Sequence, residues 1–142
     1  MVFLQELHEI VAKVDVEYYD LGRLRRNEVM ISGTDWRPVI PNAEDIINKL
    51  DELSKIAVTT DRAIKTGLAL MRIQPFRDGN KRIGSFVINK LLIQNGKGLF
   101  KVPVRLDGKF KELLVKYYET DDYDVILEFI RDNCIVGLNK ID

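Results

Sequence analysis

The stretch that decides the fold is Gln74-Pro75-Phe76-Arg77-Asp78-Gly79-Asn80-Lys81-Arg82. Its Asp-Gly pair is typical of a tight turn, because glycine adopts positive φ angles without steric cost. A strongly apolar segment, 80–94, follows directly and predicts a central helix. The start of a helix exposes unpaired backbone N–H groups and the positive end of the helix dipole, which together attract anions. The stretch therefore predicts an anion site at the first turn of a buried helix.

The side chains of the same stretch suit a bound phosphate. Arg82 falls in the first helical turn, where its guanidinium can hold two phosphate oxygens, and Lys81 adds a second positive charge. Asp78 is a hard oxygen ligand suited to Mg²⁺, and Asn80 can donate its side-chain amide to the same phosphate. These residues predict a site for a nucleotide diphosphate group. A capped helix start with solvated charges is the alternative interpretation of the same residues.

Apolar periodicity predicts that most of the remaining chain is helical. Asn42, with Asp45 three residues later, is a weaker form of a capping box, and Thr59 or Thr60 is the expected cap of the next helix. The predicted helices cover residues 3–20, 43–57, 61–73, 80–94, 110–118 and 125–137. The fold class that follows is an all-α bundle.

Residues 28–41 differ from the helical segments. They are rich in β-branched and aromatic residues around a Ser-Gly-Thr-Asp turn, and Pro38 and Pro41 exclude a helix. This pattern predicts a short exposed hairpin. The basic run just before it, which contains Arg23, Arg25 and Arg26, is expected to be a solvated loop.

Composition restricts the class of protein. The length of 142 residues suits one domain, and the 22 basic and 22 acidic residues give no net charge, which argues against binding of duplex nucleic acid. No apolar run is long enough to predict a membrane span. Cys134 is the only cysteine, so no internal disulfide or multi-cysteine zinc site is expected. Together with first residues that lack a cationic start, this predicts a reducing, cytoplasmic location.

A family resemblance extends the interpretation. The stretch 74–82 is similar to the signature of the Fic/Doc family, His-x-Phe-x-Asp/Glu-Gly-Asn-Gly/Lys-Arg, which joins two helices. The hairpin predicted at 28–38 resembles the flap of that family, two helices upstream of the signature. The resemblance covers residues 28–134 and implies a single Fic domain over 1–142, an all-α Fic-fold bundle with a short β-hairpin flap. The signature residues matched here are Phe76, Asp78, Gly79, Asn80, Lys81 and Arg82.

The resemblance also implies roles for these residues. Members of the family bind ATP or a related nucleotide with Mg²⁺; most transfer AMP to a protein hydroxyl, and Doc-type members transfer phosphate. Asp78 would hold the Mg²⁺, and Phe76 would anchor the loop in the core. The residues that would bind the phosphates of the co-substrate ATP are Gly79, Asn80, Lys81 and Arg82.

The flap would hold a segment of the target protein by adding a strand to it, a mode that relies on backbone hydrogen bonds. Trp36 in the flap is a candidate anchor for the target, and packing of its side chain against the bundle is the alternative. The residues of the predicted docking flap are Met30, Ile31, Ser32, Gly33, Thr34 and Trp36.

The chain departs from the signature at Gln74, where the family has the histidine that takes the proton of the target hydroxyl. A glutamine amide does not accept a proton at neutral pH and cannot be a general base. The only histidine, His8, is expected to have a structural or surface role. Gln74 then orients a hydroxyl or a water, or the chain is a nucleotide-binding pseudoenzyme, or the glutamine is an engineered change that traps a complex.

Two further departures concern specificity and regulation. Adenylylating members have a second arginine three residues after the first, and Ser85 stands at that position, which with Lys81 resembles the Doc-type variant. No serine or threonine is followed by the inhibitory pattern x-x-x-Glu-Gly/Asn that many members carry. A separate inhibitory, antitoxin-like partner would then supply inhibition, or weak activity would make it unnecessary.

The predicted function is therefore a Fic-domain protein that binds a Mg²⁺-nucleotide. It would be a protein adenylyltransferase (AMPylation) or a Doc-like phosphotransferase with impaired or altered chemistry. The partners expected are the nucleotide and a target protein docked at the flap, without duplex nucleic acid or a membrane. The alternative is a non-catalytic module that binds nucleotide and a partner protein.

Overall fold

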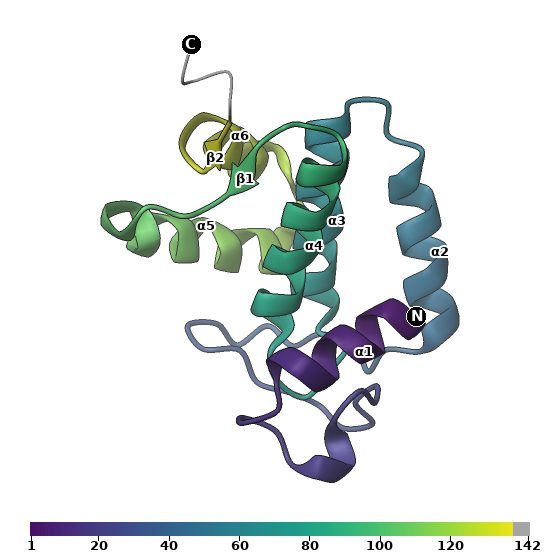
Figure 1. Cartoon of the computed structure of the whole chain (residues 1–142). Helices are drawn as coiled ribbons and strands as arrows, with labels where there is room; N and C mark the ends of the chain where they lie inside the picture. The colour runs from purple at the N-terminus through teal and green to yellow at the C-terminus, as the bar shows by residue number, and fades with distance from the viewer. Residues whose placement is uncertain (138–142) are drawn as a thin grey trace.

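The computed structural model describes residues 1–137, and their architecture is helical (Figure 1). The all-α prediction is confirmed. Two single-turn 3₁₀ helices, η1 (Tyr18–Asp20) and η2 (Val104–Leu106), lie in the connections. The α-helices are α1 (Val2–Val11), α2 (Ala43–Ser54), α3 (Thr59–Ile73), α4 (Asn80–Gln94), α5 (Asp107–Thr120) and α6 (Asp124–Asn133).

Helices α3 and α4 form an antiparallel pair at the centre of the molecule (Figure 1). They approach closely where Gly67 faces Gly84: a Cβ on either glycine would lie 2.6 Å from the carbonyl oxygen of the other. Helices α5 and α6 cover one side of the pair around Ile88, Tyr117 and other buried apolar residues. On the other side, α1 and α2 contribute to a second apolar cluster with the loop that joins α3 to α4. That loop is therefore anchored in the core.

The ends of several helices follow the expectations, and others differ. Asn42 caps α2 as predicted, because its Oδ1 accepts a hydrogen bond from the backbone N–H of Asp45 at 2.8 Å. Helix α3 begins at Thr59 without a side-chain cap, so neither threonine has the predicted capping role. The first helix ends at Val11 rather than near residue 20, since the last residue of its predicted stripe, Val14, is 90% exposed and has no core to contact.

The segment predicted as a hairpin, 28–38, forms an irregular loop in which no strand pairing is present. The strand pair of the described chain lies elsewhere: β1 (Leu99–Phe100) pairs antiparallel with β2 (Ile135–Val136). The flap is held instead by side chains. The hydroxyl of Thr34 donates to a carboxylate oxygen of Glu119 at 2.5 Å, and Trp36 packs between Arg72 and Tyr118. These contacts replace a partner strand and fix the flap to the bundle.

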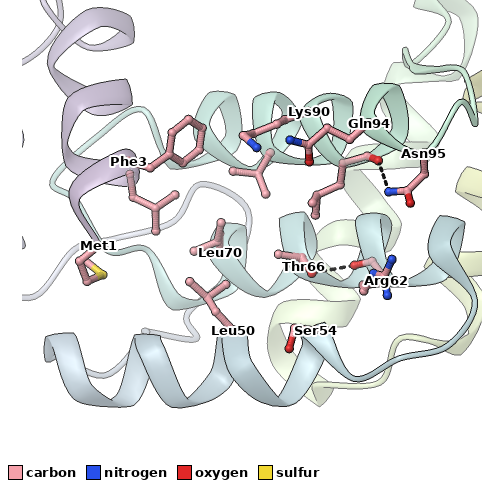
Figure 2. A pocket seen from close by; sticks show the side chains of 13 residues that line it. Met1, Phe3, Leu50, Ser54, Arg62, Thr66, Leu70, Lys90, Gln94 and Asn95 are labelled. Atoms are coloured by element: carbon pink, nitrogen blue, oxygen red, sulfur yellow. Dashed lines mark hydrogen bonds between the residues drawn. The ribbon is translucent and has the colours of Figure 1, made fainter.

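An apolar cleft of about 770 Å³ lies between α1, α2, α3 and α4. Figure 2 shows Leu50 of α2 and Leu70 of α3 pointing into it, with Phe3 of α1 toward one end and Arg62 toward the other. No residue of the stretch 74–82 lines this cleft. Within residues 1–137, none of the helices has both the length and the apolar character needed to span a bilayer.

Candidate functional site

The site is built on the loop that joins α3 to α4. Two residues of this loop have left-handed backbones: Gln74, with φ 53° and ψ 63°, ends α3, and Gly79, with φ 80°, precedes α4. The glycine fits this conformation without steric cost, whereas glutamine rarely adopts it. Between them the buried Pro75 and Phe76 enter the core. The loop 74–79 therefore reverses the chain between α3 and α4 and exposes Arg77 and Asp78 to solvent.

Asn80 holds this loop together from inside. Its side chain is only 3% exposed; its Oδ1 accepts from the N–H of Phe76 at 2.9 Å. Its Nδ2 donates to the carbonyl of Phe76 at 2.8 Å and to Oε1 of Gln74 at 3.0 Å. Both amide hydrogens are thus used within the loop, so the side chain that the sequence assigned to a phosphate acts here as an internal brace.

His8, the only histidine, supports the loop from α1. It is fully buried and stacks on Phe76, with ring centroids 4.0 Å apart. Its Nδ1 accepts from the N–H of Gly22 at 2.9 Å, which leaves the Nε2 hydrogen to donate to the carbonyl of Asp78 at 3.1 Å. Burial lowers the pKa of His8, and the ring is neutral in this arrangement. The structural role expected for His8 is confirmed, and its contact with the loop was not foreseen.

A buried arginine supports the other end of the loop. Arg25, expected in a solvated run, is only 6% exposed. Its guanidinium donates to the carbonyls of Ile73 and Gln74 at the end of α3, at 3.2 and 2.5 Å, and to that of Val39 beyond the flap at 2.6 Å. A cation at the carbonyl end of a helix is stabilised by the helix dipole. Arg25 therefore joins α3, the loop and the flap.

The first turn of α4 has no side-chain cap. The first backbone bond of the helix runs from the N–H of Ile83 to the carbonyl of Gly79, and the N–H of Gly79 donates to Oδ1 of Asp78 at 2.6 Å. Among the described residues, no partner satisfies the N–H groups of Asn80, Lys81 and Arg82. The predicted anion site would use these three amides, which are the donors that the first turn of a 15-residue helix leaves without intrahelical partners.

Arg82 is not free beside these amides. One of its terminal nitrogens lies 2.7 Å from a carboxylate oxygen of Asp15, and the other donates to the carbonyl of Val11 at 2.7 Å. Lys81 is exposed and has no salt bridge among the described residues. The two predicted phosphate-binding cations thus differ: one is paired within the chain and one is open to solvent.

Two hollows flank the loop. A groove of about 660 Å³ brings four of the predicted flap residues, 30–33, together with Gln74, Lys81 and α5. Thr34 and Trp36 do not line it, because they fix the flap to the bundle. Asp78 lies in a separate recess of about 530 Å³ with residues 14–17 and Arg77. The flap groove therefore contains the signature's first position, and the separate recess contains its carboxylate.

The residues described hold no cluster of three or more histidine, cysteine or acidic side chains arranged for a metal ion. The carboxylate of Asp78 is exposed and shares its recess with the acidic residues Asp15 and Glu17. A Mg²⁺ fits such a site only when phosphate oxygens and water complete its six ligands, which is the usual arrangement for Mg²⁺ bound with a nucleotide.

Comparison with known proteins gives a match to a family model. Among curated proteins, no match to the chain is found. The family model described as Fic/DOC family matches residues 2–92, from α1 through most of α4. This range contains the flap, the loop 74–79 and the first turn of α4, and it begins and ends earlier than the range 28–134 that the resemblance covered. The chain therefore belongs to the Fic/DOC family.

Proposed function

We propose that this protein binds a Mg²⁺-nucleotide at the first turn of α4 and acts on a protein hydroxyl presented in the flap groove. The observation that carries the proposal is the uncapped start of α4, with three open amides beside Asp78, Lys81 and Arg82. Phosphate groups bind at such helix starts because N–H donors and the helix dipole act together. Family membership supports a transferase that takes its group from a nucleotide.

The residues fit the implied cofactors in distinct ways. Asp78 would supply one carboxylate oxygen to Mg²⁺, and the open amides with Lys81 and Arg82 would hold the phosphates. When bound, Mg²⁺ would neutralise charge on the phosphate oxygens and ease attack on phosphorus. Asn80 would act through the loop, because its side chain braces the turn.

The flap supports docking of a target segment. Residues 28–30 precede the turn at Ser32-Gly33 and make no backbone hydrogen bond to another described residue, and Met30 is 81% exposed. An extended backbone with unpaired N–H and C=O groups can pair with a second extended segment. Such a segment would lie beside Gln74, since residues 30–33 and Gln74 line the same groove.

The reaction lacks an evident general base. The side chain of Gln74 is bonded at both ends: its Nε2 donates to the carbonyl of Met71 at 2.6 Å and its Oε1 accepts from Asn80. His8 is fully buried with both ring nitrogens bonded, and burial raises the pKa of Tyr118 in the groove. The target hydroxyl oxygen would attack phosphorus and lose its proton to water, with pyrophosphate leaving in AMP transfer or ADP in phosphate transfer. Loss of a positioned base costs about 10²–10⁴ in rate.

The bonded state of Gln74 also favours a second candidate, a non-catalytic module that binds nucleotide and a partner protein. One experiment separates the two. Purified protein is incubated with Mg²⁺, lysate proteins and ATP labelled at the α- or the γ-phosphate. Label on a target that disappears in the variant Arg82→Ala, and remains in the control variant Arg105→Ala, supports the transferase. Label that appears only after Gln74→His supports the module. Absence of ATP binding by calorimetry in every variant contradicts both.

A further inference from the structure

The guanidinium of Arg82 already has a carboxylate partner in this fold. Its Nη2 lies 2.7 Å from Oδ2 of Asp15, and its Nη1 donates to the carbonyl of Val11, the last residue of α1. The side chains are 45% and 38% exposed, so the pair sits at the surface where a solute could reach it. The same guanidinium stands in the first turn of α4, beside the open amides.

The segment that carries Asp15 lies directly against the loop. A Cβ on Gly79 would lie 3.4 Å from the Cβ of Ala12 and 3.5 Å from Nη2 of Arg82. Residues 14–17 share their recess with Asp78. The carboxylate of Asp15 thus places a negative charge beside the atoms that would bind a phosphate, where it both occupies Arg82 and repels an incoming anion.

We infer that Asp15 is an internal competitor for the phosphate site, and that a nucleotide phosphate must displace it from Arg82 to bind. This inference rests on the proposed function, because it names what opposes binding at the same site. The carbonyl of Val11 keeps the guanidinium at the end of α1 when Asp15 is released, so the displaced state retains one of the two contacts. The segment 12–17 then controls access to Arg82.

The size of the effect follows from the exposure of the pair. A surface ion pair contributes up to about 1 kcal/mol, which corresponds to about a fivefold change in a binding constant. Removal of the competing carboxylate should therefore tighten binding of Mg²⁺-ATP about fivefold. If the carboxylate instead orients Arg82 toward the phosphate, its removal should weaken binding of Mg²⁺-ATP. The direction of the change in affinity therefore decides between the two roles.

The test is calorimetric titration of the full chain with ATP in the presence of Mg²⁺. The variants are Asp15→Asn, Arg82→Ala and the two combined. Glu17→Gln is the matched control, because it removes one negative charge from the same recess without a salt bridge to Arg82. Circular dichroism confirms that each variant is folded.

The inference predicts about fivefold tighter binding for Asp15→Asn, little change for Glu17→Gln, and no gain from Asp15→Asn when Arg82 is already alanine. Equal or weaker binding by Asp15→Asn overturns the inference and leaves the proposed function standing. An equal gain in both acid variants also overturns it, because the effect is then general charge repulsion. Absence of ATP binding by the native chain and by Asp15→Asn overturns the proposed function together with the inference.

Discussion

The side-chain amide of Asn80 donates to Oε1 of Gln74 at 3.0 Å across the turn between α3 and α4. The same glutamine donates one Nε2 hydrogen to the carbonyl of Met71 in α3, so both polar atoms of the side chain at the signature's first position already have a partner within the chain. A histidine base at this position would need a ring nitrogen open to a substrate hydroxyl. The glutamine therefore changes both the chemistry of the position and its availability.

Replacement of Gln74 by histidine tests the missing base directly. We expect Gln74→His to increase transfer of label from ATP to a target by about 10²–10⁴, the usual contribution of a positioned general base. The measurement is the initial rate of transfer with the α- and γ-labelled nucleotides. Gln74→Ala is the control: it frees the same space without a base and should give no increase. A Gln74→His variant that binds ATP and transfers no faster than the native chain contradicts the assignment of this position.

Asn80, the first residue of α4, should contribute strongly to stability because its buried side chain holds the preceding loop. Asn80→Ala removes three hydrogen bonds and leaves the N–H and C=O of the buried Phe76 without these partners. We expect the free energy of unfolding to fall by about 3 kcal/mol. Urea denaturation measures it, and Asn133→Ala is the control, because Asn133 is exposed and donates once, to the carbonyl of Phe129. Equal decreases in the free energy of unfolding in the two variants would show that the side chain of Asn80 does not stabilise the loop.

The buried histidine predicts a pH dependence of stability. Burial lowers the pKa of His8 in the folded state below its usual 6.5, so the unfolded chain binds more protons as the pH falls through that value. The stabilisation is complete above pH 6.5 and is lost as the pH decreases toward the lowered pKa. Between pH 7.5 and 5.5 we expect the free energy of unfolding to fall by up to about 1.4 kcal/mol.

Urea unfolding at pH 7.5, 6.5 and 5.5 measures this dependence. The chain has a single histidine, so His8→Gln should remove the loss over this range while lowering stability at pH 7.5. A native chain whose free energy of unfolding is the same at pH 7.5 and 5.5 would contradict the neutral, buried state of His8.

The sequence predicted the features that depend on local pattern. Turn chemistry at Asp78-Gly79 and continuous apolar periodicity located the loop and α4, and Asn42 identified the start of α2. The flap was predicted as a hairpin because its β-branched residues suit a strand. In the structure, Thr34 and Trp36 instead hold the flap against α5 and α3. Such contacts join residues far apart in the chain and leave no local signature.

The supports of the site were missed for the same reason. In the sequence, Arg25 is one of three neighbouring arginines that all look exposed. Its hydrogen bonds to the carbonyls at the end of α3 depend on the fold. His8 had a usable signal: Leu4, His8 and Ala12 are spaced four residues apart and all three are buried, so the histidine lies on the apolar face of α1. Arg82 and Asp15 are 67 residues apart in sequence, so their salt bridge could be identified only from the structure.

The close approach of α3 and α4 predicts that the same substitution, glycine to alanine, has opposite effects on the free energy of unfolding at two positions. In Gly84→Ala, the new Cβ would lie 2.6 Å from the carbonyl oxygen of Gly67 and 2.6 Å from Cγ of Met71, so the two central helices must move apart. We expect the free energy of unfolding to fall by about 3 kcal/mol. Gly108→Ala is the same chemical change in the first turn of α5, where nothing lies within 4 Å of the new Cβ.

Gly108→Ala should raise the free energy of unfolding by about 0.5–1 kcal/mol, because alanine has less conformational entropy to lose and fits a helix. Thermal and urea denaturation of the two variants, side by side, measure the contrast. Since α3 and α4 carry both ends of the loop 74–79, Gly84→Ala should also weaken ATP binding, while Gly108→Ala should leave it unchanged. A Gly84→Ala variant as stable as the native chain would mean that α3 and α4 do not pack through this pair of glycines.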